Sequence, residues 1–290
     1  MEVNVSIVIP VRLAQATIES TLDAAIAQAR EAGGEVVAAV WREDPSFEIV
    51  QSVASRERDI LRIVVSEQRT AVPQLRRDGV RTARAPWIVI TEDHCLFPPQ
   101  WLKGLLATEG DVRGGGVENG RRCYAGWAQY FARYNAFMPP VPGGPTKFLP
   151  GNNACYPRHL LDSVSIDEGF WEAELNRELL ARGARFVANP SLTVEQRQER
   201  GWFEFAVLRF HHGRCYGGRR DGSRLRSLLR TPFIPAILAW RNVRAAVAKR
   251  YHIGWFILSL PLLACYILAW SLGETVGYLA GPGDSCTKTD

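Results

Sequence analysis

Two carboxylates and an imidazole stand together directly after an apolar run. Glu92, Asp93 and His94 follow residues 87–91 (WIVIT), which have the pattern of a buried strand. Carboxylate oxygens suit Mg²⁺ or Mn²⁺, and such a cation bridges a diphosphate and neutralises its charge. The imidazole is a ligand that Mn²⁺ also accepts. The alternative is that the two acids cap a helix that begins near Trp101.

The elements that must position this triplet alternate between strand and helix patterns. Strand patterns cover Val5–Ile9, Val36–Val40, Ile60–Val65 and Trp87–Thr91. Helix patterns cover Ala14–Ala32, Phe47–Arg58 and Val72–Ala85. This alternation predicts right-handed crossovers and a parallel sheet. In such sheets ligands bind beyond the carboxyl ends of the strands, which is where the triplet is expected to lie.

Composition limits the class of protein. The chain has 290 residues, enough for one or two domains, and 47% hydrophobic against 22% charged residues excludes wholesale disorder. The net charge of +5 is compatible with nucleic acid, a membrane surface or a phosphorylated substrate. The sequence shows no recognisable nucleic-acid-binding module, so no nucleic-acid partner is expected. The six cysteines form no CxxC motif, and reduced thiols are expected.

The C-terminal part of the chain differs in character. Residues 253–272 carry no charged side chain and form a run about long enough to cross a bilayer. Trp255 and Trp270 stand near its ends, where interface anchors occur. Residues 201–252 hold eleven Lys and Arg against two acidic residues, which predicts a basic helix at a membrane surface. The alternatives are a buried helix for the apolar run and a solvated face for the basic segment.

Several stretches together resemble one known family. They are VSIVIPVR, RTAVPQLRRDGVRTARAPWIVITEDHCLFPPQWL, FLPGNNACYPRHLL and DEGFWEAELNRELLARG. In this order they resemble the family 2 glycosyltransferases of the GT-A fold, over about residues 3–215. The resemblance implies an α/β fold with a Rossmann-like, mostly parallel sheet flanked by helices. It also implies a metal-dependent enzyme that transfers a sugar with inversion from a nucleotide-sugar donor, with Mg²⁺ or Mn²⁺ as cofactor. The implied process is synthesis of a bacterial-type cell-envelope glycan.

The resemblance also assigns residues to the donor site. Asp93 and His94 occupy the metal-binding positions of the family's DxD triplet, with His94 in place of the usual second Asp. Arg76 matches the arginine that lies near the nucleotide, and either Glu43 or Asp44 matches the acid that holds the base. The donor-binding positions implied in this way are Pro10, Arg12, Glu43, Asp44, Arg76, Glu92, Asp93, Asn152, Asn153 and Arg214.

The same resemblance assigns the catalytic base to Glu172. An inverting transfer is a single displacement, in which a general base takes the proton of the acceptor hydroxyl. Glu172 and Glu174 have the alternative role of first-turn acids that complement the dipole of their helix. Asn152 and Asn153 offer amides to sugar hydroxyls, or alternatively form a turn. Arg214, which follows His211-His212-Gly213, contacts the diphosphate or faces solvent.

The expected organisation is a GT-A catalytic domain over residues 1–220 and a tail over residues 221–290. The tail contains basic amphipathic helices and the membrane segment. Such a layout suits a membrane lipid or lipid-linked acceptor. A catalytically lapsed scaffold of the same fold is an alternative, because the DxD triplet and the acid pair depart from the family pattern. A basic nucleic-acid-binding protein is the remaining alternative.

Charge on either side of the apolar run predicts its orientation. Arg241, Arg244, Lys249 and Arg250 precede the run, whereas Lys288 is the one basic residue that follows it. Positive charge favours the cytoplasmic side of a membrane. The catalytic domain is therefore expected at the cytoplasmic face, anchored by the C-terminal segment.

Overall fold

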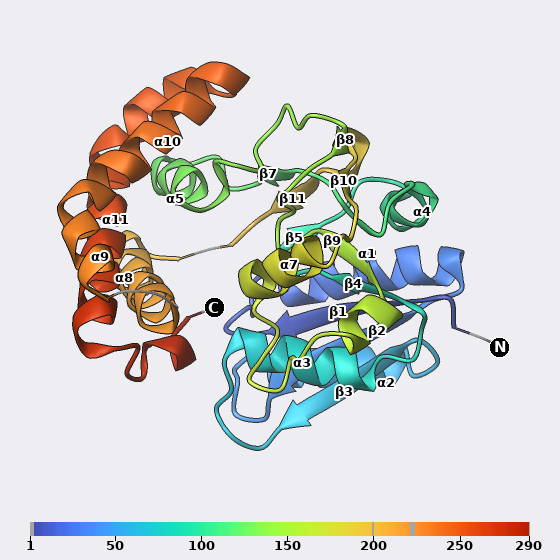
Figure 1. Cartoon of the computed structure of the whole chain (residues 1–290). Coiled ribbons are helices and arrows are strands. Elements are labelled where there is room, and N and C mark those ends of the chain that lie inside the picture. The colour runs from blue at the N-terminus through green and yellow to red at the C-terminus, as the bar shows by residue number, and fades with distance from the viewer. Residues whose placement is uncertain (1–2, 199, 221–223, 290) are drawn as a thin grey trace. The chain divides into compact units, whose positions relative to one another are not determined.

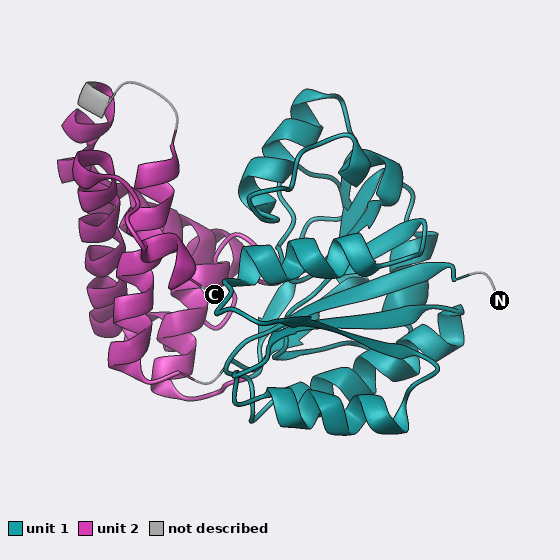
Figure 2. Cartoon of the chain, turned by 90° about the horizontal axis from the view of Figure 1, so that it is seen from below, with its two compact units in different colours: residues 1–120, 139–198 teal, residues 121–138, 199–290 magenta. Residues whose placement is uncertain are grey.

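The computed structural model describes residues 3–198, 200–220 and 224–289. By its internal contacts the chain divides into two compact units (Figure 2). Unit 1 comprises residues 1–120 and 139–198, and unit 2 comprises residues 121–138 and 199–290. The boundary expected after residue 220 borders residues 221–223, which lie outside the described part of the chain.

A large mixed sheet forms the centre of unit 1 (Figure 1). Its strand order is β3-β2-β1-β4-β9-β6-β10-β8, and β1 to β4 pair in parallel. Strand β9 is antiparallel to both β4 and β6, so it interrupts the parallel run. The strands of this sheet are β1 (Val5–Val11), β2 (Glu35–Trp41), β3 (Leu61–Ser66), β4 (Trp87–Ile90), β6 (Val112–Gly114), β8 (Gly144–Pro145), β9 (Ala154–Pro157) and β10 (Phe186–Ala188).

Helices cover both faces of this sheet (Figure 2). They are α1 (Ile18–Ala32), α2 (Phe47–Arg56), α3 (Val72–Thr82), α4 (Trp101–Ala107), α6 (Arg158–Asp162) and α7 (Glu172–Ala181). Helix α3 approaches the sheet closely at Gly79, where a Cβ atom would lie 2.5 Å from Cγ1 of Val8. Because both faces are covered, β1 is buried along its whole length, which explains its continuous apolar sequence. The alternation of strands and helices expected over residues 5–91 is confirmed.

A second, small sheet holds the segment that follows the acidic triplet. Its strands are β5 (Cys95–Leu96), β11 (Val194–Gln196) and β7 (Val117–Asn119), in that order. Cys95 pairs with Gln196, and the N–H of Arg197 donates to the carbonyl of His94 at 2.7 Å. The chain after β4 is therefore fixed on its far side by residues about a hundred positions away in the sequence.

Unit 2 is helical. It contains α5 (Tyr124–Tyr134), α8 (Trp202–Arg219), α9 (Arg224–Arg230), α10 (Ile234–Lys249) and α11 (Ile253–Ala280), with short 3₁₀ turns η2 (Thr231–Phe233) and η3 (Ser285–Thr287). Within the described residues, α11 is the one helix that is long and apolar enough to cross a membrane. It extends past the apolar run of residues 253–272 by two further turns.

The expectation that all cysteines are reduced thiols is wrong for one pair. A disulfide joins Cys215 in α8 to Cys286 in η3. The two residues are 71 positions apart, so their spacing in the sequence carries no sign of the bond. Cys95, Cys123, Cys155 and Cys265 are free thiols.

Candidate active site

The loop after β1 is tied to the ends of β2 and β4 by two aspartates. The N–H of Arg12 donates to Oδ2 of Asp93 at 2.7 Å, and the N–H of Leu13 donates to the Asp44 carboxylate at 3.0 Å. Leu13 has a φ of 52°, a conformation that non-glycine residues seldom adopt. These bonds bring the three strand ends together at one edge of the sheet, where ligands bind in folds of this type.

The turn after β2 distinguishes the two candidate base-holding acids. Asp44 is buried and also accepts a bond from the N–H of Ser46 at 2.9 Å, whereas Glu43 is exposed. The hydroxyl of Ser46 in turn accepts a bond from the N–H of Ala14 at 2.8 Å. Ser46 is a positioning residue that the sequence interpretation missed. Its signal was the Asp-x-Ser spacing, which is typical of an Asx turn.

The triplet after β4 is buried and internally bonded. Nδ1 of His94 lies 2.8 Å from Oδ1 of Asp93, and Nε2 lies 3.1 Å from Oε2 of Glu92. The second contact has ion-pair distance but poor hydrogen-bond geometry. Burial by itself lowers the pKa of His94, but the interactions with the carboxylates of Asp93 and Glu92 outweigh it and raise that pKa to about 9. At neutral pH His94 is therefore a cation held between two carboxylates.

The backbone of the triplet is fixed by the N-cap residue and the first turn of α1. The carbonyl of Asp93 accepts bonds from the hydroxyls of Thr17 at 3.0 Å and Thr21 at 3.1 Å. The two threonines are one helical turn apart, so both face the same point on the β4 end. They are further positioning residues that the sequence interpretation missed. Their spacing on a helix is too common to have marked them in advance.

Arg76 joins the triplet to the candidate base. Nη2 donates to Oε1 of Glu92, and Nη1 donates to Oε2 of Glu172, each at 2.7 Å. The arginine side chain is 4% exposed and that of Glu92 is 8% exposed, whereas that of Glu172 is 37% exposed. Elements β4, α3 and α7 thus meet at one guanidinium. Of the two first-turn acids of α7, it is Glu172 whose carboxylate is directed into this cluster.

The loop at residues 151–153 lies against the same cluster. A Cβ atom on Gly151 would lie 2.8 Å from the carboxyl carbon of Glu172. Any larger residue at this position would therefore displace the carboxylate. Asn152 is buried and donates to Sγ of Cys95 at 3.5 Å. Asn153 uses both amide N–H groups on the carbonyls of Gly116 and Leu192. A bond from the Asn153 amide nitrogen to a sugar hydroxyl would therefore require breaking one of these.

The remaining predicted donor residues are Pro10 and Arg214. Pro10 is buried within β1, where it pairs with Ala39 of β2. Arg214 belongs to α8 of unit 2, where its Nε donates to the carbonyl of Gly281 at 3.2 Å. Its contact with a donor diphosphate stays a prediction. Within the described residues, no group of three or more His, Cys, Asp or Glu side chains is arranged to hold a metal ion.

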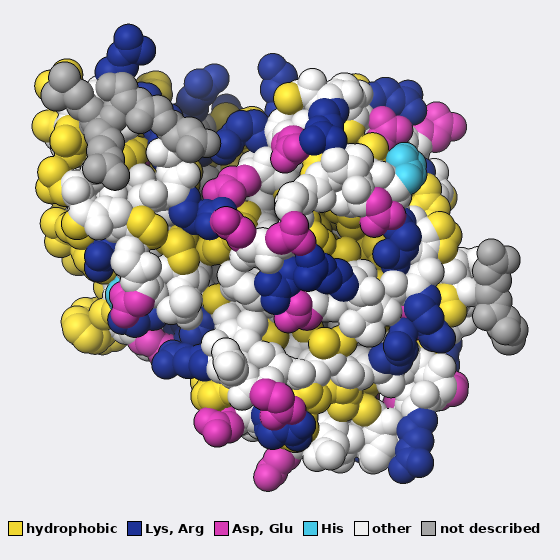
Figure 3. Space-filling model, turned by 60° about the horizontal axis from the view of Figure 1, so that its bottom comes forward, with side chains coloured by type: hydrophobic (Ala, Val, Ile, Leu, Met, Phe, Trp, Pro, Cys, Tyr) yellow, Lys and Arg dark blue, Asp and Glu magenta, His cyan; other side chains and the backbone are white. Residues whose placement is uncertain are grey.

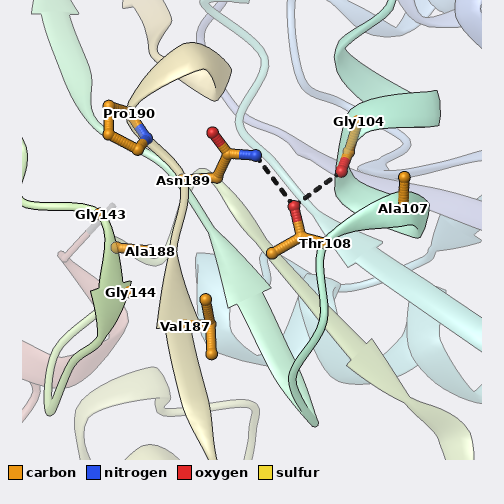
Figure 4. A pocket seen from close by; sticks show the side chains of 9 residues that line it. All are labelled: Gly104, Ala107, Thr108, Gly143, Gly144, Val187, Ala188, Asn189 and Pro190. Carbon is orange, nitrogen blue, oxygen red and sulfur yellow. Dashed lines mark hydrogen bonds between the residues drawn. The ribbon is translucent and has the colours of Figure 1, made fainter.

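A hollow elsewhere on unit 1 does not contain this cluster. It lies between the C-terminal end of α4, the strand β8 and the end of β10 (Figure 4). Asn189 donates to the hydroxyl of Thr108 at 3.0 Å on its wall, and that hydroxyl donates to the carbonyl of Gly104 at 2.8 Å. These polar groups already pair with one another. None of the predicted site residues lines the hollow.

Solved structures share the fold of the chain. A mannosyltransferase from Pyrobaculum calidifontis, in complex with GDP-Man and Mn²⁺, is similar with a TM-score of 0.62 at 17% identity, covering 94% of this chain and 87% of that one. S. aureus TarS 1–349, in complex with UDP-GlcNAc, gives 0.52 at 10% identity, covering 96% and 92%. GalNAc-T7 with UDP, GalNAc and Mn²⁺ gives 0.50 at 13% identity, covering 69% of this chain and 44% of that one.

Sequence comparison identifies the family. No curated protein sequence matches the chain significantly. The family model described as glycosyl transferase family 2 matches residues 6–152. The matched stretch runs from β1 through the acidic triplet to the Gly151-Asn152 loop, and so includes most of the cluster around Arg76. The chain belongs to glycosyl transferase family 2, and its fold is GT-A-like.

Proposed function

We propose that this family 2 glycosyltransferase transfers a sugar with inversion from a nucleotide sugar to a membrane-borne, lipid or lipid-linked acceptor. The observation that carries the proposal is the guanidinium of Arg76, which binds Glu92 on one side and Glu172 on the other at 2.7 Å. A donor-side carboxylate and a candidate base are thereby held next to each other. Glycosyl transfer needs both within reach of the same sugar carbon.

The donor is proposed to bind at the carboxyl ends of β1, β2 and β4. Asp44 and Asp93 already organise this edge by accepting bonds from the backbone after β1. Exposed Glu43 stands next to Asp44 at the position assigned to the base of the nucleotide. Solved structures of similar fold are complexes with GDP-Man and with UDP-GlcNAc, which supports a nucleotide-sugar donor and leaves both bases as candidates.

Asp93 and His94 offer ligand atoms of the types that a divalent cation binds. Asp93 offers a carboxylate and His94 an imidazole, a pair that suits Mn²⁺ better than Mg²⁺. Two side chains make an open site, which the diphosphate oxygens and water would complete. The two ligands are bonded to each other at 2.8 Å, so a metal cation must displace that bond and also the proton that His94 carries at neutral pH. When bound, the cation would supply positive charge against the leaving diphosphate.

Glu172 is proposed as the general base. It takes the proton of the acceptor hydroxyl as the oxygen attacks the anomeric carbon, on the face opposite the leaving nucleoside diphosphate. The bond from Arg76 and the close approach of Gly151 orient its carboxylate, and 37% exposure of its side chain leaves it open to an acceptor. An acceptor that is itself a phosphate would need little deprotonation, and the base would then contribute less.

Membrane association is proposed from α11 and the charge before it. The first 20 residues of the helix, 253–272, carry no charged side chain, and four basic residues precede them whereas one follows the helix. This asymmetry supports the cytoplasmic face as the location. Nucleotide sugars of the cytoplasm and an acceptor held in the bilayer would then meet at the same surface.

Product analysis tests the inverting transfer. The full chain is incubated with a nucleotide sugar and vesicles that contain lipid extract, and release of nucleoside diphosphate is followed together with the NMR coupling constant of the product's anomeric proton. We expect diphosphate release that depends on the vesicles, and an anomeric configuration opposite to that of the donor. Retained configuration would contradict the single displacement. Absence of release with every donor would favour a catalytically lapsed scaffold instead.

A further inference from the structure

The apolar helix α11 has two different faces. One face is buried in unit 2, and its members recur with helical spacing: Phe256, Ser259, Leu263, Tyr266, Ile267, Ser271, Glu274 and Tyr278. The opposite face exposes large apolar side chains, with Ile257 at 60%, Leu268 at 58% and Leu272 at 60% exposure. We call this exposed face the α11 stripe, formed by Ile253, Ile257, Leu260, Leu268 and Leu272. A helix surrounded by lipid would expose apolar side chains on all sides.

The buried face of α11 is covered by α5 and α8. Phe256 packs on Phe131 of α5 with ring centroids 5.2 Å apart, and Tyr266 packs on Phe205 of α8 at 4.8 Å. Further along, Glu274 is 6% exposed and accepts bonds within α11 from Trp270 and Tyr278. The cover therefore runs along most of the helix rather than touching it at one point.

Glycines hold α8 against α11 at backbone distance. A Cβ on Gly213 would lie 2.2 Å from the carbonyl oxygen of Trp270, and one on Gly217 would lie 2.4 Å from that of Glu274. On the α11 side, Gly273 and Gly277 approach the α8 backbone equally closely. Both helices thus contribute a GxxxG pair to one contact. The disulfide joins Cys215 of α8 to Cys286 of η3, the turn that follows α11.

Helix α8 is too polar to enter the hydrocarbon with α11. Its 18 residues include Glu204, Arg209, His211, His212, Arg214 and Arg219. Arginine at the centre of a bilayer is costly in free energy. Since α8 cannot leave α11 without breaking the glycine contact, lipid cannot surround the C-terminal half of the apolar run. One face of α11 remains available to a membrane.

Helix α10, together with Phe233 of η2 just before it, adds a second exposed apolar surface beside a basic one. Phe233, Ile237, Trp240 and Val247 are 63%, 44%, 64% and 64% exposed, and they recur at three-, four- or seven-residue intervals. We call them the α10 ridge. Arg230, Arg241, Arg244 and Arg250 are exposed on the same segment of the chain. In Figure 3 hydrophobic side chains line the left edge of the view, over the helices of unit 2.

We propose that α11 lies in the plane of an anionic phospholipid surface and does not cross it. The α11 stripe and the α10 ridge would dip into the acyl boundary, and the four arginines would contact lipid phosphates. This inference rests on the proposed function in taking a membrane as the partner. It differs in placing both ends of α11, and hence the C-terminus, on the catalytic side of the bilayer.

Depth measurements distinguish lying from crossing. The full chain carrying Cys123→Ser keeps Cys265 as a spin-label site on the exposed side of α11. Ile257→Cys, Leu268→Cys and Leu272→Cys are introduced singly into a Cys123→Ser, Cys265→Ser background. In vesicles of phosphatidylglycerol and phosphatidylcholine we expect all four labels at one shallow depth, about 5–10 Å below the headgroups. Depth that increases to the bilayer centre, about 15 Å, and decreases again would overturn the proposal.

Vesicle binding tests the α10 ridge separately. Trp240→Glu is expected to weaken binding to the anionic vesicles about tenfold or more, because it removes an aromatic anchor and adds like charge. Phe148→Glu makes the same change at a 72% exposed position of unit 1 and should leave vesicle binding as in the wild type. Equal loss in both variants, or no vesicle binding by the wild type, would overturn the inference. Nucleotide-sugar binding, measured without vesicles, shows whether the proposed function fails as well.

Discussion

Replacing Glu172 with glutamine is expected to lower the rate of sugar transfer by roughly two to four orders of magnitude. Glutamine keeps the size of the side chain and can still accept a bond from Arg76, so the fold around α7 should persist. It cannot take a proton from the acceptor hydroxyl. Turnover is measured at saturating donor, and binding of the donor is measured in the same preparation. We expect the donor dissociation constant to change by less than about threefold.

Glu174 provides the matched control for this experiment. It lies in the same first turn of α7 but is exposed. The 2.7 Å bond from Arg76 to this helix goes to Glu172. Glu174→Gln should therefore retain the wild-type rate. Equal rates for Glu172→Gln and the wild type would remove Glu172 from the mechanism. Equal losses in both variants would point to the dipole of α7, rather than to a base, as the important feature.

Replacing Arg76 with leucine is expected to lower the free energy of unfolding by about 3 kcal/mol. The side chain is 4% exposed, and its loss removes a charge partner from the buried carboxylate of Glu92, which keeps its contact with His94 at 3.1 Å. The retained His94 contact is the reason to expect the lower end of the range for a broken buried pair, about 3–5 kcal/mol. Urea denaturation followed by circular dichroism measures the change through the midpoint and slope.

Arg77 is the control for Arg76. It stands next in α3, is 22% exposed and pairs with the neighbouring Asp78 at 2.7 Å. Because that pair is partly solvated, Arg77→Leu should change the free energy of unfolding by less than about 1 kcal/mol. If the two leucine variants are destabilised equally, the arrangement of Glu92, Arg76 and Glu172 has no special energetic weight.

Many of the strands and helices of unit 1 could be predicted from the sequence, because the residue patterns that specify them are local. The apolar run Val5–Val11, the alternation through β4, and the acids that follow the strand ends are each encoded within a few residues. The start of α7 at Glu172 was expected from the family pattern and is observed. The roles of the predicted site residues in binding or catalysis stay predictions.

Contacts between distant residues were not accessible in the same way. Arg76 is 16 positions from Glu92 and 96 positions from Glu172 in the sequence. Nothing in the local sequence of these residues predicts that one guanidinium binds both carboxylates. The faces of α11 were hidden for a different reason. Its sequence is apolar on both sides, so hydrophobic periodicity could not separate the face that packs on α8 from the face that is exposed.

Donor binding tests the central claim most directly. The melting temperature of the full chain is measured with UDP-, GDP- and dTDP-sugars, each with and without Mn²⁺, for the wild type and for Asp93→Asn. A ligand that binds the folded state raises the melting temperature by mass action. We expect at least one nucleotide sugar to raise it, more strongly with Mn²⁺, and Asp93→Asn to lose most of that shift. No shift with any donor, with or without Mn²⁺, would contradict a nucleotide-sugar site at this edge of the sheet.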